Sequence, residues 1–417
     1  MKKVSVLNLG IGFATGRKSF QKVLKTYIYN WKESGLTENQ SVRLNLFIAY
    51  DLKYSKKTRA ADFTKIDGEL LDFIDQVYFI GKSDIQNEID GLVKENAAGT
   101  EETKRFFGGG YAGQRNAVLY YAMKHKMDYL IFLDDDEYPV AVTKNRATAL
   151  WGGQHVLNTH LEYIRQADIT HGHHCGYISP IPNIRFDNVL TEPDFRLFIE
   201  AISNDILNWD NIKTVMKNGG ATYADTNVLT RNEAEEVPEI NHAKFISGAN
   251  LCINLIRPER VHAFYNPPGA RGEDTFLSTT LGDRKVLKVP CYTFHDGFGT
   301  YDHLLDGVLP VQLKQILPDC LQVVTRFYRA CIGWIRYKPL LLYITQRESY
   351  ADIIKDIRAK LDRTIPCISA FFGREEFANI SRELEKYHKN VRKHYAEYLE
   401  MQTTWAKIRG RIAGGGL

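Results

Sequence analysis

The 417-residue sequence predicts an α/β fold in which a mostly parallel sheet is flanked by helices. Apolar segments of strand length alternate with longer segments whose apolar residues recur at helical spacing. Such alternation favours parallel strands with helices on both faces of the sheet. Beyond about residue 306 the pattern becomes entirely helical. We therefore expect a sheet-containing part over 1–305 and a helical C-terminal region over 306–417.

The first strand is expected over 4–10, following Met1 and two lysines. Its apolar run is too short, and is interrupted too early by Asn8, to be a signal peptide. A helix is expected over 20–33, where apolar residues recur every three to four positions. The next expected elements are a strand over 44–50, a short helix and a strand within 70–80, a helix over 112–126 and a strand over 129–133.

The later part of the sheet region is less regular. Residues 194–239 are polar and suggest helices that lie over a site. The other expected elements are a helix over 152–166, strands over 168–180 and 244–255, a helix that begins within 275–281, a strand over 286–290, a loop over 292–299 and helices from 309 onward.

The composition of the chain limits which classes of binding partner and which cellular compartment we expect. The net charge is only +4 and the isoelectric point is near 8.5, which argues against nucleic acid as a partner. The six cysteines are scattered without a C-x-x-C pair, so we expect reduced thiols and a cytoplasmic protein. No apolar stretch approaches the length of a membrane span.

The strand expected over 129–133 ends in four consecutive acids, Asp134, Asp135, Asp136 and Glu137. Acids packed this closely cannot all be buried as anions, so the strand should open onto solvent or a cation. Carboxylate oxygens suit hard ions such as Mg²⁺ or Mn²⁺. Ligands of an α/β sheet bind beyond the carboxyl ends of its strands. The alternative is an acidic turn that caps the following helix.

Two features near the start of the chain could contact a nucleotide. Gly10 and Gly12 follow the first expected strand and suggest a loop that lets the backbone approach a nucleotide. A dinucleotide fold is disfavoured because the third glycine, Gly16, comes one position late. Asp51 ends the second expected strand and could accept the ring N–H of uracil or guanine. Asp51 could equally form a turn.

Arg115 and Asn116 open the helix that precedes the acidic strand. Arginine can clamp a phosphate with two hydrogen bonds, and helix-start amides attract anions. The alternative is a solvated helix start. Glu273 and Asp274 stand at another expected helix start, where one of them could accept the proton of an incoming hydroxyl or simply cap the helix.

Two histidine-containing segments are candidates for metal binding. His295 follows a short expected strand and could bind the same ion as the acids, with His303 as a weaker candidate. His171, His173 and His174, next to Cys175, lack a second group at zinc-site spacing. We expect this segment to be a strand that partly lines the pocket.

Taken in order, Arg115–Asn116, Asp134–Asp136, Glu273–Asp274 and His295 resemble the motifs of GT-A glycosyltransferases, which have a Rossmann-like fold, and especially the family-two group. The resemblance covers about 300 residues. It implies a nucleotide-sugar half over about 1–140 and an acceptor half over about 141–305 of a GT-A catalytic domain.

The resemblance also implies roles for these residues. Asp136, completed by His295 and Asp134, would bind Mn²⁺ or Mg²⁺, and the donor would be a UDP- or GDP-sugar. Asp134 would also contact the donor's ribose or sugar, as would the neighbouring acid Asp135, and Asp51 would contact its base. Asp274, or less readily Glu273, would be the catalytic base. The implied activity is hexosyl transfer to a saccharide or lipid-linked hydroxyl, with inversion expected and retention as the alternative.

The sequence departs from this family in two places. The first strand lacks the usual Pro-x-Tyr-Asn start, and the Gln-x-x-Arg-Trp motif of processive synthases is absent. Beyond 309, basic residues such as Arg326 and Arg336 alternate with apolar ones. This pattern is typical of helices packed on the core or on another subunit of a homo-oligomer, and less so of a peripheral contact with the inner face of a membrane. The rival functions are a sugar nucleotidyltransferase and a non-catalytic carbohydrate-binding protein.

Overall fold

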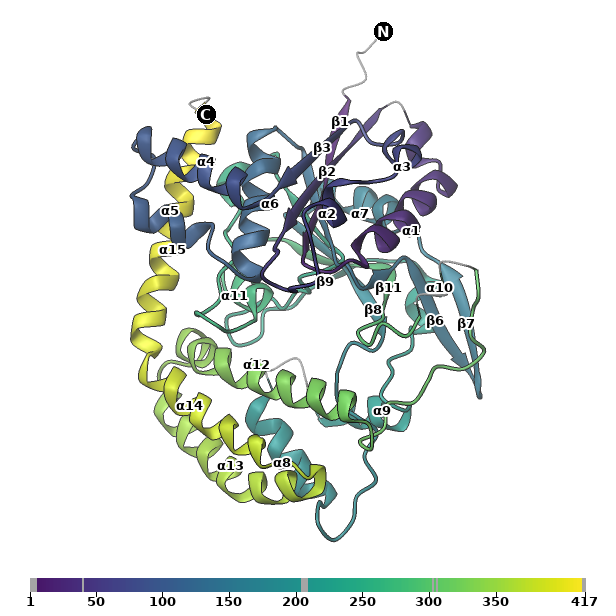
Figure 1. The fold of residues 1–417 in the computed structure, drawn as a ribbon, viewed down its shortest axis with the longest axis vertical. Helices are drawn as coiled ribbons and strands as arrows, with labels where there is room; N and C mark the ends of the chain where they lie inside the picture. The colour runs from purple at the N-terminus through teal and green to yellow at the C-terminus, as the bar shows by residue number, and fades with distance from the viewer. Residues whose placement is uncertain (1–5, 40, 204–208, 302–303, 305–306, 415–417) are drawn as a thin grey trace.

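A computed structural model describes residues 6–39, 41–203, 209–301, 304 and 307–414. His303 lies outside the described residues. The chain has an α/β fold with a curled sheet flanked by helices and a helical C-terminal region (Figure 1). The sheet has the strand order β3-β2-β1-β4-β10-β8-β11-β5, with β9 beside β11. The strands are β1 (Leu7–Thr15), β2 (Val42–Tyr50), β3 (Gln76–Ile80), β4 (Tyr129–Leu133), β5 (Glu137–Tyr138), β8 (Ile169–Gly176), β9 (Glu235–Glu236), β10 (Leu251–Asn254) and β11 (Val286–His295).

The sheet is mixed rather than mostly parallel. Strands β3, β2, β1 and β4 are parallel neighbours, and β8 is parallel to β11. Between these two groups β10 runs antiparallel to both β4 and β8. The strands of both parallel groups therefore point the same way, and their carboxyl ends share one edge of the sheet.

Strand β1 extends five residues beyond the predicted strand, which makes the predicted glycine loop wrong. Gly10 and Gly12 lie inside β1, on the face covered by α6 (Tyr111–Lys124). A methyl group at Gly12 would come within 2.5 Å of Val118 Cγ1, and one at Gly10 within 3.2 Å of Leu130 Cδ1. Gly12 allows α6 to pack closely on the sheet, and the space at Gly10 is filled by side chains of the core. Both glycines therefore lie in the core and not in the predicted loop.

The opposite face of β1 carries Leu9, Ile11 and Phe13, which pack in one core with α1 (Phe20–Glu33). The other helices of this part are α2 (Ala61–Thr64), α3 (Gly68–Leu71), α4 (Lys82–Lys94), α5 (Thr100–Phe106), α7 (Val156–Tyr163), α8 (Glu192–Ile202), α9 (Trp209–Lys217), α10 (Thr226–Arg231) and α11 (Glu273–Ser278). Of these, α8 and α9 lie away from the sheet, beside the C-terminal helices (Figure 1).

A separate hairpin was not predicted. Strands β6 (Val140–Asn145) and β7 (Thr148–Gly153) pair antiparallel, and the latter occupies the start of the helix expected over 152–166. The strand expected over 244–255 is confined to β10, and the strand expected over 286–290 continues into the predicted loop as far as His295.

The C-terminal region consists of α12 (Leu321–Thr345), α13 (Tyr350–Phe372), α14 (Asn379–Lys389) and α15 (Val391–Ala413). Helix α13 packs against α8, and α15 returns to α5, as Figure 1 shows. Phe327 of α12 lies 6.1 Å from Phe195 of α8 between ring centroids. The helical region and the sheet-containing part therefore share a hydrophobic core.

Candidate active site

The acids at 134–137, called the acid cluster below, follow the end of the fully buried strand β4. Because β1 and β2 are parallel to β4, residues at the ends of these strands meet at the same edge. The Thr15 hydroxyl donates to Asp135 Oδ2 at 2.5 Å, and the Asp51 amide donates to the Thr15 carbonyl at 2.9 Å. Strand β11 ends at His295 and pairs there with β5. The structure therefore brings the acids, Asp51 and His295 to one edge of the sheet.

Asp135 is buried, and its charge is balanced by Arg17, a residue that no motif in the sequence marks as part of a site. Arg17 Nη1 lies 2.8 Å from Asp135 Oδ1 and also pairs with Asp136 Oδ2. Burial raises the pKa of Asp135, and the Arg17 charge opposes that rise. Arg17 comes two residues after the end of β1, so its position follows from the strand's true end.

Asp136 and His295 form an ion pair. His295 Nε2 lies 3.4 Å from Asp136 Oδ2, and its Nδ1 donates to the Tyr177 carbonyl at 2.7 Å. Burial opposes a charge on the imidazole, but the Asp136 carboxylate outweighs it and raises the pKa of His295 to about 9. Burial likewise opposes ionisation of Asp136, yet His295 and Arg17 hold its pKa well below the ordinary value. The pair is thus charged at neutral pH.

A divalent ion fits this pair in part. Two adjacent ligands of an octahedral Mg²⁺ or Mn²⁺ ion lie about 3 Å apart, close to the separation of Asp136 and His295. Within the described ranges, no three His, Cys, Asp or Glu side chains converge in a way that could hold a metal. Mg²⁺ commonly takes one or two protein ligands and completes its shell with water and substrate phosphates. Asp136 and His295 suit that arrangement once Arg17 releases the carboxylate and the imidazole loses its proton.

Arg115 is buried and joins two carboxylates. Its Nη2 donates to Asp134 Oδ1 at 3.0 Å and its Nε to Glu273 Oε1 at 3.3 Å, while Nη1 donates to the Gly248 carbonyl. Burial raises the pKa of Asp134 to about 7, with Arg115 opposing and the neighbouring acids adding to the rise. Arg115 is therefore a positioning residue for the two acids, which differs from the predicted phosphate clamp. Asp134 faces Arg115, which differs from its predicted place on the metal.

Asn116 is fully buried and supports the core. Its amide nitrogen donates to the carbonyls of Phe106 and Phe264 at 3.1 and 3.0 Å, and its amide oxygen accepts from the Phe264 N–H at 2.8 Å. With 0% of its surface exposed, Asn116 serves the core in this structure, and its contact with a donor stays a prediction. The burial of Asn116 could not be predicted from the neighbouring sequence, because its partner Phe264 is distant in the chain.

Glu273 and Asp274 begin α11, and they differ in accessibility. Glu273 is buried against Arg115, and burial together with the neighbouring Asp274 charge raises its pKa. Asp274 is only partly buried and accepts the backbone N–H groups of Gly248 and Thr275 at 3.1 and 2.8 Å. Asp274 is therefore the more accessible of the two acids for an incoming hydroxyl.

The fourth acid, Glu137, is buried behind the others. Its Oε1 lies 3.2 Å from His174 Nδ1, and its Oε2 accepts the Thr293 hydroxyl at 2.6 Å. His171, on the same strand β8, is buried, and its ring nitrogens have no hydrogen-bond partner among the described residues. Burial lowers the pKa of His171 well below the ordinary value, so its ring is neutral.

Asp51 lies at the end of β2 and holds a local turn. Its Oδ1 accepts the Lys53 N–H at 2.8 Å, and the side chain is partly exposed. Three residues on, the ring of Tyr54 lies 5.7 Å below the Arg17 guanidinium. A methyl group at Gly16 would come within 2.4 Å of Tyr54 Cβ, so Gly16 provides the space for this stacked pair. The stacked pair of Tyr54 and Arg17 thus lies at the same edge of the sheet as Asp51.

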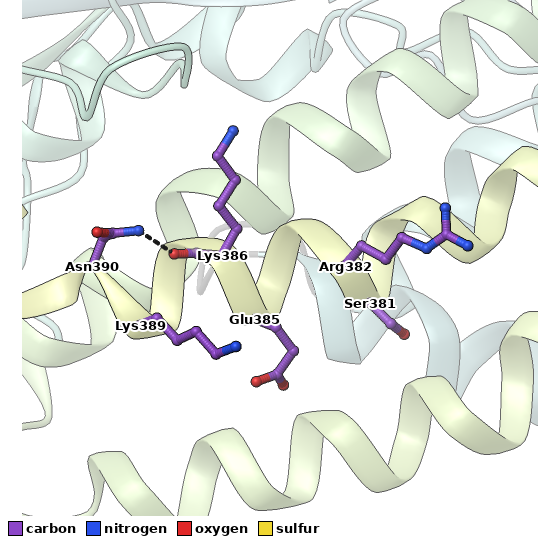
Figure 2. A pocket seen from close by; sticks show the side chains of 6 residues that line it. All are labelled: Ser381, Arg382, Glu385, Lys386, Lys389 and Asn390. Carbon is purple, nitrogen blue, oxygen red and sulfur yellow. Dashed lines mark hydrogen bonds between the residues drawn. The ribbon is translucent and has the colours of Figure 1, made fainter.

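A shallow hollow in the C-terminal region contains none of these residues. Its lining comes from α14 and Asn390, and Figure 2 shows Lys386 pointing away from Glu385 and Lys389. Glu385 is paired with Arg358 Nε at 2.5 Å. The hollow therefore lies on one helix surface and is unrelated to the acid cluster.

Comparison with protein-family models and with curated proteins finds no match for this chain. Across the part of the chain that the structure describes, no helix has both the length and the apolar character needed to cross a membrane.

Proposed function

We propose that this chain is a metal-dependent glycosyltransferase of the GT-A type, which transfers a sugar from a UDP- or GDP-linked donor to the hydroxyl of a saccharide or lipid-linked acceptor. One observation carries the proposal. Arg115 bridges Asp134 at the end of β4 and Glu273 at the start of α11, at 3.0 and 3.3 Å. Glu273 precedes the expected base, Asp274, whose carboxylate accepts the N–H of Gly248, the residue whose carbonyl Arg115 also contacts. The acid cluster and the expected base therefore lie on two sides of Arg115.

The metal would be held by Asp136 and His295, with the donor's phosphate oxygens completing its shell. When bound, such an ion neutralises the negative charge that develops on a leaving diphosphate. Asp136 supports this role because it is already an anion at neutral pH. Its place at the edge where β1, β2 and β4 end matches the usual ligand position of α/β sheets.

Asp274 is the proposed base for the acceptor hydroxyl. Two backbone N–H groups fix its carboxylate, and the side chain remains partly exposed. Direct displacement with this base would invert the anomeric centre. Retention with the same metal site is the alternative outcome, and the anomer of the product distinguishes the two.

A sugar nucleotidyltransferase is the second candidate, and Arg17 favours it. The guanidinium of Arg17 stands at the end of β1 beside two acids, where it could bind a triphosphate once released from Asp135 and Asp136. This enzyme would release pyrophosphate from a nucleoside triphosphate, whereas a glycosyltransferase releases a nucleoside diphosphate.

Donor hydrolysis tests the proposal. The purified chain is incubated with Mn²⁺ and separate UDP- and GDP-sugars, and with a sugar 1-phosphate plus UTP or GTP. We expect slow release of UDP or GDP from one sugar nucleotide, dependent on Mn²⁺. Asp136→Asn should abolish this release. Once an acceptor is found, Asp274→Asn should slow transfer about 10²- to 10⁴-fold.

Asp90→Asn is the matched control, because Asp90 lies on α4 and accepts a hydrogen bond from Gln86 at 2.8 Å, far from the acid cluster in sequence. It should turn over like the parent chain. Release of pyrophosphate in place of a nucleoside diphosphate would favour the second candidate. Equal turnover in the Asp136 variant and the parent would remove the metal assignment.

A further inference from the structure

Helix α12 of the C-terminal region reaches the acid cluster through Arg326. The Arg326 guanidinium lies 4.5 Å above the ring of Phe298. A methyl group at Gly297 would come within 1.9 Å of Arg326 Nη2 and within 2.8 Å of His295 Cε1. Arg326 and the imidazole that pairs with Asp136 therefore flank Gly297 and lie close together.

A second arginine approaches the same site from the segment before α11. Arg271 lies two residues before Glu273, and its guanidinium lies 5.6 Å from the centre of the Tyr111 ring. A methyl group at Gly333 of α12 would lie 3.6 Å from Arg271 Cδ. Arg271 thus stands between the start of α6 and the face of α12 that carries Arg326.

These two arginines differ from Arg17 and Arg115, which are paired with carboxylates. Within the described residues neither Arg326 nor Arg271 has an acidic partner within ion-pair distance. Burial lowers the pKa of Arg326, the like charges of Arg17 and Arg271 add to this, and Asp136 and Asp296 oppose it. Arg326 is half-buried and Arg271 is exposed. A half-buried guanidinium that is paired with no carboxylate at ion-pair distance is costly unless an anion is bound, and Arg271 lies where it could reach the same anion.

We infer that Arg326 and Arg271 bind a diphosphate group, so that helix α12 completes the site and the C-terminal region takes part in substrate binding. The inference rests on the proposed function for its choice of ligand. Guanidinium groups bind phosphate oxygens through paired hydrogen bonds. The diphosphate could belong to a nucleotide or to a lipid-linked acceptor, since both present the same oxygens.

Calorimetry with the full chain, in the absence of divalent metal, tests the inference. The probes are inorganic pyrophosphate, UDP, GDP and farnesyl diphosphate. We expect the parent to bind pyrophosphate, and Arg326→Gln and Arg271→Gln each to weaken binding about 10- to 100-fold. Arg329→Gln is the matched control, because Arg329 is an exposed residue of α12 and should bind like the parent. If UDP or GDP loses affinity in the two Gln variants, the diphosphate belongs to a nucleotide. If farnesyl diphosphate loses affinity instead, it belongs to a lipid-linked acceptor.

Thermal melting checks that the variants are folded. If the Gln variant is destabilised, Arg326→Lys replaces it in the test. Because Lys keeps the positive charge, this variant should retain part of the affinity for pyrophosphate. The inference fails if the parent does not bind pyrophosphate, or if the folded Gln variants bind it as the parent does. Arginine-dependent pyrophosphate binding without any turnover of sugar nucleotides would leave the anion site standing and refute glycosyl transfer. Donor turnover that persists unchanged in Arg326→Gln would leave glycosyl transfer standing and refute the role of Arg326 in binding the diphosphate.

Discussion

The ion pair between Asp136 and His295 makes a prediction that is independent of the proposed reaction. Replacing Asp136 by Asn keeps the size of the side chain and removes its charge. The buried imidazole then lacks the carboxylate 3.4 Å away that stabilises its proton. We expect the pKa of His295 to fall from about 9 to 6.5 or below, because burial then acts unopposed by Asp136.

The magnitude follows from the two pKa values. The difference between 6.5 and about 9 corresponds to about 3 kcal/mol at about 1.36 kcal/mol for each pKa unit. Since the folded-state pKa is raised, this contribution to stability is fully present below pH 6.5 and is lost as the pH rises through about 9. The metal-free chain should therefore lose up to about 3 kcal/mol of unfolding free energy from this group across that window.

Two assays measure the effect. Proton NMR titration of His295, assigned by its absence in His295→Gln, gives the pKa in the parent and in Asp136→Asn. Urea unfolding at the two ends of the window, with EDTA present, gives the change in unfolding free energy. The Asp90→Asn chain should keep the parent's pH dependence. If the Asp136 variant keeps both the high pKa and the parent's pH dependence, the reasoning about this ion pair is wrong.

Three further substitutions test the packing around the site, each measured by urea unfolding. Arg115→Met leaves the buried Glu273 and the half-buried Asp134 without their shared partner and should cost about 3–5 kcal/mol, and a loss below about 1 kcal/mol would contradict the bridging role. Asn116→Ala should cost about 1–3 kcal/mol and leave nucleotide affinity unchanged, whereas a selective loss of affinity would restore its predicted donor contact. Gly12→Ala should cost about 1–3 kcal/mol because the added methyl group meets Val118, while Gly152→Ala, which has open space, should be close to neutral.

The acidic strand end could be predicted because it has a local cause. A five-residue apolar run followed by charged residues is typical of a buried strand that stops at the surface, and β4 ends where the run ends. His295 was anticipated only through its order in the chain. Its contact with Asp136 depends on β11 continuing into the range of the predicted loop, as far as His295.

The errors arise where long-range packing decides the outcome. Gly10 and Gly12 resemble a flexible loop in the sequence, but both lie inside β1, where α6 needs the space at Gly12 and side chains from other strands need the space at Gly10. The hairpin of β6 and β7 turns through Arg146, which has a positive φ of 56°, where Gly or Asn would have signalled a turn. Arg326 lies nearly 200 residues after the acids, so no local pattern could connect them.

The return of α15 to α5 has a consequence for synthesis of the chain. Trp405 stacks on Phe106 at 5.3 Å and donates its indole N–H to the Val261 carbonyl at 2.8 Å. During synthesis on the ribosome, the apolar surface around Phe106 stays uncovered by α15 until residue 405 has been made. Folding of the sheet-containing part around Phe106 is thereby coupled to the synthesis of α15.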